Sequence, residues 1–123
     1  MPIAYWCILV AAFLPFAWVK YAKAGSGSDN RNPREDQLAP RQRRAYAAHQ
    51  NAFESFPFFA VAVLAALTMG ASVGTVNILA LLYILLRVAH GLLYIADKSA
   101  LRSLSFALAM IVNVAIFALP AFK

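Results

Sequence analysis

Residues 43–69, RRAYAAHQNAFESFPFFAVAVLAALTM, begin with polar side chains and end in a long apolar run. The first turns of this stretch are polar on some faces, and the remainder is apolar. A helix needs about 20 predominantly apolar residues to span a bilayer. The stretch therefore predicts a membrane helix whose polar groups are gathered near one end.

Apolar runs of similar length lie on both sides of this stretch. Residues 2–19 and residues 103–122 carry no charged side chain. Residues 69–74 have the composition of a tight turn, and Ser72 or Thr75 can cap the helix that follows. No stretch has the alternating period of a strand. We expect an all-α integral membrane four-helix bundle, a single domain over residues 1–123, with helices at about 2–22, 43–69, 75–96 and 102–122 and a polar loop at 24–42.

The first apolar run has an alternative interpretation as a cleaved signal peptide. Ala22, Lys23 and Ala24 resemble a small-residue cleavage site. No basic segment precedes the run, and the run is longer than the usual apolar region of a signal peptide. Both observations favour a membrane helix.

Composition supports a membrane protein. Of the 123 residues, 63% are hydrophobic and only 13% are charged, and the mean hydropathy is +0.67. Soluble domains carry roughly 45–50% apolar and about 25% charged residues, so a soluble enzyme is excluded. The single cysteine, Cys7, cannot form an intrachain disulfide.

The positions of the basic residues predict the orientation in the membrane. Two of them, Lys98 and Arg102, lie at the link between the last two helices, and the link at 69–74 has none. Most of the others surround the loop at 24–42: Lys20, Lys23, Arg31, Arg34, Arg41, Arg43 and Arg44. The positive-inside rule makes the first and third loops cytoplasmic and both termini external, in the plasma (inner) membrane. The net charge of +6 therefore indicates orientation and contact with anionic lipids rather than a nucleic-acid partner.

Polar side chains inside the expected helices are the candidates for function. A charged side chain at mid-membrane costs roughly 2.5–3.5 kcal/mol on insertion scales, so it is seldom kept without a role. Glu54 lies three residues before Pro57, and the next charged residue is Arg87. Helical spacing puts two sets on adjacent faces of residues 43–69: Arg43, Ala47, Gln50 and Glu54 on one, and Arg44, Ala48, Asn51 and Ser55 on the other.

A second polar stripe is predicted on the helix at 75–96. Tyr83, Arg87, His90, Tyr94 and Lys98 recur at helical spacing. Exposing such a stripe to lipid costs free energy, so it should face another helix or a water-filled pocket. Both stripes adjoin the expected cytoplasmic side and should therefore lie at the same depth.

A purely structural interpretation remains open for these residues. Arg87 can neutralise Glu54, and Asn51, Asn77 and Asn113 can be hydrogen bonders between helices. His49 then is a solvated residue at a helix end. The two histidines lack the spacing of a metal site, so no metal is expected.

The motifs in two of the helices resemble those of a known family. Residues 48–57, AHQNAFESFP, contain Asn-x-x-Glu-x-x-Pro, with Arg44 and Ala45 upstream. Residues 87–94, RVAHGLLY, are followed by Arg102. Both segments resemble a bacterial-type member of the MAPEG family (membrane-associated proteins in eicosanoid and glutathione metabolism), and the likeness extends over essentially the whole chain.

This resemblance implies a homotrimer that binds glutathione between neighbouring subunits near the cytoplasmic side. The glutathione contacts that it implies are Asn51, Glu54, Arg87, His90 and Tyr94. Arg102, after an alignment gap of one residue, takes the place of the arginine that activates the glutathione thiol. Lys20 or Lys23 stands near the basic residues that end the family's first helix.

Two positions depart from the family pattern. Ala47 replaces an arginine of the better-known enzymes, and Arg43 or Arg44, one turn earlier, can reach the ligand instead. We assign Arg44 to the site. Phe106 replaces a tyrosine of some synthases, which weakens an assignment to synthase chemistry.

Three functions are weighed on this basis. The first is a glutathione-dependent transferase or peroxidase that acts on lipophilic electrophiles, with Arg102 stabilising the thiolate. The second is a non-enzymatic trimer that binds or presents a lipid, because family membership does not prove catalysis. The third is a small proton-coupled exporter with Glu54 as the coupling carboxylate.

Overall fold

A computed structural model describes residues 1–23 and 40–122, and every regular element within them is a helix. The elements are α1 (Ile3–Lys23), α2 (Pro40–Thr68), α3 (Val73–Ile95) and α4 (Ser99–Ala118), followed by the short 3-10 helix η2 (Leu119–Phe122). The all-α prediction is confirmed. Most of the expected polar loop, with Arg31 and Arg34, lies outside the described residues, as do the side chains of Lys23 and Arg41.

Three helices begin earlier than the sequence predicts, and α3 starts at Val73 rather than at 75. Pro40 starts α2, since the fixed φ of proline suits the first helical position and its missing N–H costs no hydrogen bond there. The fourth helix begins at Ser99 rather than at 102, because Ala100 and Leu101 are strong helix formers. The link between α3 and α4 is therefore shorter than expected.

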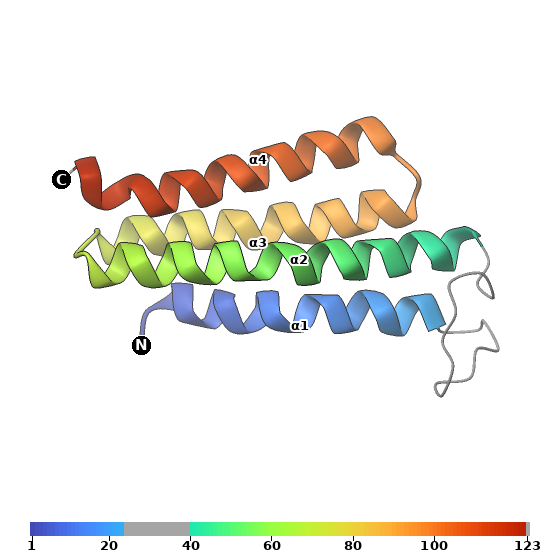
Figure 1. Cartoon of the computed structure of the whole chain (residues 1–123), viewed down its shortest axis with the longest axis horizontal. Coiled ribbons are helices and arrows are strands. Elements are labelled where there is room, and N and C mark those ends of the chain that lie inside the picture. The colour runs from blue at the N-terminus through green and yellow to red at the C-terminus, as the bar shows by residue number, and fades with distance from the viewer. Residues whose placement is uncertain (24–39, 123) are drawn as a thin grey trace.

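The four helices lie side by side with alternating direction (Figure 1). One end of the bundle holds the end of α1, the start of α2 and the α3–α4 link. We call this the link end. The opposite end, the termini end, holds both chain termini and the α2–α3 turn. This arrangement fits the expected topology, in which both termini share one side of the membrane.

Local chemistry fixes both described connections. Gly70 has φ 84°, a left-handed conformation that glycine adopts without strain. Ser72 caps α3 by accepting a hydrogen bond from the Thr75 N–H at 3.5 Å, as one of the two expected capping residues. At the other link, Asp97 has φ 62°, and the Lys98 N–H closes the end of α3 on the Leu93 carbonyl at 2.9 Å.

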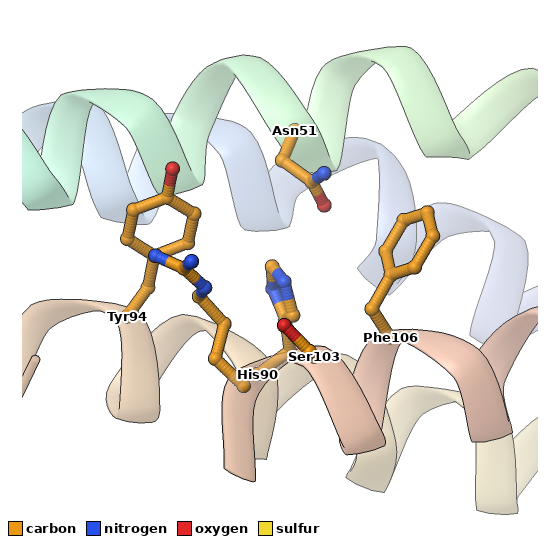
Figure 2. Close-up of a pocket in the computed structure, with 6 residues that line it drawn as sticks. Asn51, His90, Tyr94, Ser103 and Phe106 are labelled. Carbon is orange, nitrogen blue, oxygen red and sulfur yellow. The ribbon is translucent and has the colours of Figure 1, made fainter. Parts of the chain in front are cut away.

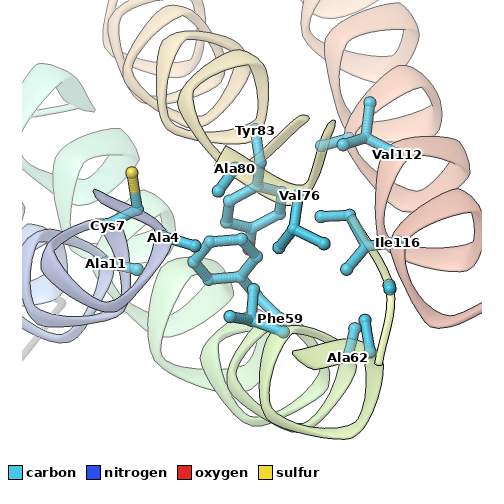
Figure 3. Packing of buried hydrophobic residues seen from close by; sticks show 14 residues of the cluster. Ala4, Cys7, Ala11, Phe59, Ala62, Val76, Ala80, Tyr83, Val112 and Ile116 are labelled. Carbon is cyan, nitrogen blue, oxygen red and sulfur yellow. The ribbon is translucent and has the colours of Figure 1, made fainter. Parts of the chain in front are cut away.

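The main hydrophobic core fills the half of the bundle toward the termini end, and Figure 3 shows its packing from close by. The rings of Phe59 and Tyr83 stack at its centre, with centroids 4.0 Å apart and planes 8° from parallel. Around them are small side chains, which let neighbouring helices approach closely. We call this set the apolar cluster: Ala4, Cys7, Ala11, Phe59, Ala62, Val63, Ala66, Ala71, Val76, Ala80, Tyr83, Ala109, Val112 and Ile116.

A smaller cluster joins α1, α2 and α3 near the link end. It contains Trp18, Ala45, Ala48, Ala52 and Ile95. The indole of Trp18 lies against the backbone of α3, where a Cβ at Gly91 would overlap the ring. Glycine is therefore required for this contact between α1 and α3.

The outer surface of the bundle is apolar. Large exposed hydrophobic side chains occur on every helix, among them Phe13, Phe53, Ile78 and Ile111, each more than 60% exposed. All four helices are long and apolar enough to cross a membrane. An apolar surface of this extent suits contact with lipid rather than water. The chain is a multi-pass membrane protein.

Two polar residues bond to α1, His49 against the expectation and Asn77 as expected. His49 is half-buried, and its Nδ1 lies 2.7 Å from the Pro15 carbonyl oxygen of α1, so its interpretation as a solvated residue is wrong. The Oδ1 of Asn77 accepts a hydrogen bond from the Ala4 N–H at 2.9 Å. Asn77 thus joins α3 to the first turn of α1, consistent with a structural role.

Candidate functional site

Arg87 and Asn51 meet inside the bundle. Arg87 of α3 is only 3% exposed, and its Nη2 donates a hydrogen bond to the Oδ1 of Asn51 in α2. Its Nη1 is buried and has no hydrogen-bond partner among the residues that the structure describes. The two polar stripes therefore lie at the same depth, as predicted.

A pocket of about 250 Å³ opens beside this pair (Figure 2). Helices α2, α3 and α4 all contribute to its wall. In Figure 2 the Asn51 carboxamide points across the pocket toward His90 and the α4 side chains. The lining side chains are Asn51, His90, Tyr94, Arg102, Ser103 and Phe106. We call this the site pocket.

The cation of the site pocket is held by an aromatic ring. The guanidinium carbon of Arg102 lies 4.3 Å from the centroid of the Tyr94 ring. The face of an aromatic ring attracts a cation, and the attraction strengthens when water is excluded. Arg102 is half-buried, so this contact fixes its position in the first turns of α4, beside the site pocket.

His90 lies between two aromatic rings at the back of the pocket. It is 3% exposed, with the Tyr94 ring edge-on at 5.7 Å and the Phe106 ring at 6.0 Å between centroids. Phe106 therefore forms part of the pocket wall. The wall is apolar at this point.

Ser103 is a pocket residue that the sequence analysis did not single out. It follows Arg102 directly, and Arg102, Ser103 and Phe106 share one face of α4. Helical spacing from Arg102 and Phe106 was the signal that could have identified it. Two residues later in α4, the Ser105 hydroxyl donates a hydrogen bond to the Arg102 carbonyl oxygen at 2.9 Å.

Three predicted site residues, Arg87, Arg44 and Glu54, do not line the site pocket of this single chain. The Nε of Arg44 donates to the Ile95 carbonyl oxygen at 3.0 Å. Arg44 therefore binds the carboxyl end of α3, where orphan carbonyl groups attract cations. Glu54 lies on the exposed face of α2, with Arg43 and Gln50.

The structural alternative in which Glu54 neutralises Arg87 is not found within the described residues. Arg87 is buried and bonded to an amide, whereas the Glu54 carboxylate is exposed on a neighbouring face of the same helix as Asn51. Among the residues that the structure describes, the Arg87 guanidinium therefore has no carboxylate partner. A buried cation in that state favours an anionic or acceptor-rich ligand.

The site pocket is rich in hydrogen-bond donors. Arg102, Asn51 and Ser103 supply hydrogen-bond donors, and no carboxylate is among the described lining residues. The described residues also contain no group of three His, Cys, Asp or Glu side chains that could hold a metal ion. The pocket suits a polar ligand with carboxylate or carbonyl oxygens.

Comparison with known proteins identifies the family. The MAPEG family profile matches residues 3–122, nearly the whole chain. Comparisons with curated proteins and with solved structures give no match. The family match covers every helix and every residue of the site pocket. The chain therefore belongs to the MAPEG family, a family of glutathione-related membrane proteins.

Proposed function

We propose that the protein is a glutathione-dependent transferase or peroxidase that acts on lipophilic electrophiles in the membrane. The observation that carries the proposal is the Arg102 guanidinium, held 4.3 Å over the Tyr94 ring in a pocket lined by Asn51 and His90. This cation is fixed within an otherwise apolar bundle. Membership of the MAPEG family supports the same ligand.

The polar groups match the charges of glutathione. Glutathione has two carboxylates, an ammonium group and a thiol, so its site needs cations, an anion and an orienting amide. Asn51 and the Arg102 guanidinium suit the carboxylate and carbonyl oxygens. Glu54 suits the ammonium group, but it faces outward from the protomer. A homotrimer, in which a neighbouring subunit covers this face of α2, completes the site.

Arg102 activates the thiol in this proposal. A nearby guanidinium stabilises the thiolate and lowers the pKa of a thiol from about 8.5 toward neutrality. In transfer, the thiolate sulfur bonds to the electrophilic carbon, and the leaving group departs or the adduct takes a proton. In peroxide reduction, two glutathione molecules supply the electrons, the O–O bond breaks, and glutathione disulfide, an alcohol and water are formed.

The apolar surface gives the second substrate its route. A groove of about 390 Å³ between α2 and α4 is lined almost wholly by apolar side chains. A lipophile reaches the protein from the bilayer, and glutathione enters from the cytoplasm at the link end. The groove shares no residue with the site pocket, so the lipophile moves along the helices to the thiolate, where proximity promotes the reaction. The lining residues are Pro57, Phe58, Val61, Ala62 and Phe117.

Conjugation by the purified protein tests the proposal. The full chain in lipid nanodiscs is given glutathione with a chlorodinitrobenzene, and separately with a lipid hydroperoxide. We expect turnover, and a loss of about 100-fold in kcat for Arg102→Ala, the size seen when a preorganised electrostatic stabiliser is removed. Lys98→Ala, which removes an exposed cation at the same link, is the control. Unchanged turnover in Arg102→Ala overturns the mechanism.

The same apolar groove also favours a second candidate, a trimer that binds a lipid without chemistry. This candidate predicts tight binding of a lipophile by the wild-type protein. It also predicts no product with either electrophile at any glutathione concentration. The two candidates are therefore separated by one turnover assay.

A further inference from the structure

We infer that Arg87 is a positioning residue, which turns the Asn51 carboxamide so that its Nδ2 donates to a carboxylate or carbonyl oxygen of glutathione. The inference rests on the proposed function for the identity of the ligand. It identifies the atom of the Asn51 carboxamide that contacts the ligand, and it names Arg87 as the residue that determines this orientation.

Hydrogen-bond chemistry decides how the Asn51 amide is turned. A guanidinium carries only donors, and a carboxamide carries one acceptor oxygen and one donor nitrogen. The atom of Asn51 that faces the Nη2 of Arg87 must therefore be Oδ1, which is the contact observed. With Oδ1 occupied by Arg87, the NH2 group is what Asn51 offers to a ligand in the site pocket that it lines.

Burial assigns Arg87 to this indirect role. Arg87 is 3% exposed and is not among the described side chains that line the site pocket, whereas Asn51 is half-buried and lines it. Arg87 thus reaches the pocket through Asn51. A cation inside a membrane bundle is expensive, and the unpartnered Nη1 adds to that cost. A packing role alone does not explain why such a group is kept.

The division of charge around α2 supports a donor role for Asn51. The carboxylate that suits the ligand's ammonium group, Glu54, lies on the outward face of the helix. The inward side of the pocket presents Arg102 and His90 beside Asn51. The acceptor groups of the ligand should therefore point inward toward Asn51, and its ammonium group outward.

Asn51→Asp tests the direction of this hydrogen bond. Aspartate keeps the shape of the side chain and its partner Arg87, but it presents an acceptor and negative charge to the pocket in place of donors. Measured by calorimetry in nanodiscs, Asn51→Asp should bind glutathione at least about tenfold more weakly than the wild-type protein, the scale of a lost charge-assisted hydrogen bond. Equal or tighter binding means that Asn51 accepts from the ammonium group, and it overturns the inference.

A double-mutant cycle tests whether Arg87 acts through Asn51. Arg87→Met, which keeps the length of the chain, should weaken glutathione binding severalfold in the wild-type background and have no further effect in the Asn51→Ala background. Arg87→Lys, also a donor only, should restore part of the affinity. Equal losses in both backgrounds show direct contact of Arg87 with the ligand and overturn the positioning role.

A control variant and the binding of glutathione by the wild-type protein distinguish a failure of this inference from a failure of the proposed function. Asn77→Ala, which removes an amide bonded to α1 at the termini end, should leave the glutathione affinity of the folded protein unchanged. A wild-type protein that binds no glutathione overturns the proposed function and this inference with it. A wild-type protein that binds glutathione but shows no coupling between Arg87 and Asn51 overturns the inference alone.

Discussion

The two halves of the bundle are built from different side chains. Toward the termini end, the apolar cluster packs alanines around the stacked rings of Phe59 and Tyr83. Toward the link end, the site pocket gathers Asn51, His90 and Arg102, with Arg87 buried behind them. Each half also holds buried polar atoms with no hydrogen-bond partner among the described residues: the Asn113 carboxamide beside the apolar cluster, and the Nη1 of Arg87 in the other half.

This difference separates stability from ligand binding. Packing of apolar side chains and small residues holds membrane helices together, and the apolar cluster supplies most of it here. The polar groups near the link end contribute little to that packing, and in the proposed function they bind the ligand. Variants in the apolar cluster should therefore unfold the protein without changing the site, and variants in the site pocket should do the reverse.

The largest effect is expected from Phe59→Ala. Phe59 is fully buried, and its loss leaves a cavity beside Tyr83, which should lower the free energy of unfolding by roughly 3–5 kcal/mol. A graded SDS titration measures this change. The neighbouring Phe58→Ala, at an exposed position, should cost far less. Similar losses in the two variants, or a changed KM for glutathione in the folded Phe59→Ala protein, contradict the division into halves.

Gly91→Ala should give the next largest loss of stability, and it tests the packing where the two halves of the bundle meet. Its Cβ would overlap the indole of Trp18, so α1 and α3 must separate, at a cost of roughly 1–3 kcal/mol. Trp18→Phe in the same protein should recover part of the stability. Gly74→Ala is the control, because its Cβ would meet no atom within 4 Å. Unaltered stability in Gly91→Ala would show that this contact does not hold α1.

Substitution of Tyr94 tests how the site pocket holds its cation. Arg102 rests on the ring face, so Tyr94→Leu should lower kcat/KM about tenfold, a cation–π contribution of about 1 kcal/mol or more. Tyr94→Phe keeps the ring and should lose severalfold less. Steady-state conjugation assays measure both, and the SDS titration should move little for either. Equal losses of activity in the two variants would assign the effect to the hydroxyl group instead.

Glu54→Gln should have the smallest effect. The carboxylate is exposed on the single chain, and pairs of this kind contribute about 0.2–1 kcal/mol. The KM for glutathione should therefore rise about two- to fivefold with kcat unchanged, in assays at varied glutathione concentration. Proton flux driven by a substrate in vesicles, and lost in Glu54→Gln, would instead support the proton-coupled exporter.

The sequence predicted the helices and several of the residues that line the site pocket. The lengths of the apolar runs predicted the four helices. Helical spacing predicted that Arg87, His90 and Tyr94 share one face of α3, and this face lies opposite Asn51. Spacing defines which residues share a face, but not which face turns inward. For that reason Glu54 was expected beside the other site residues and lies on the outer surface of α2.

Contacts between segments that are far apart in the chain could not be predicted from the sequence. The bond from Arg44 to the Ile95 carbonyl depends on how α2 and α3 are aligned. The contact between His49 and Pro15, and that between Trp18 and Gly91, depend on the packing of α1. A single sequence carries no signal for such pairs, because each residue alone fits several environments.

The thiolate absorbance of bound glutathione tests the central claim most directly. Glutathione is titrated at neutral pH into wild-type protein and Arg102→Ala in nanodiscs, and ultraviolet difference spectra are compared with binding measured by calorimetry. The account predicts a thiolate band that saturates with binding in the wild-type protein and is absent from Arg102→Ala at equal occupancy. Bound glutathione without a thiolate band in the wild-type protein, or an unchanged band in Arg102→Ala, would contradict it.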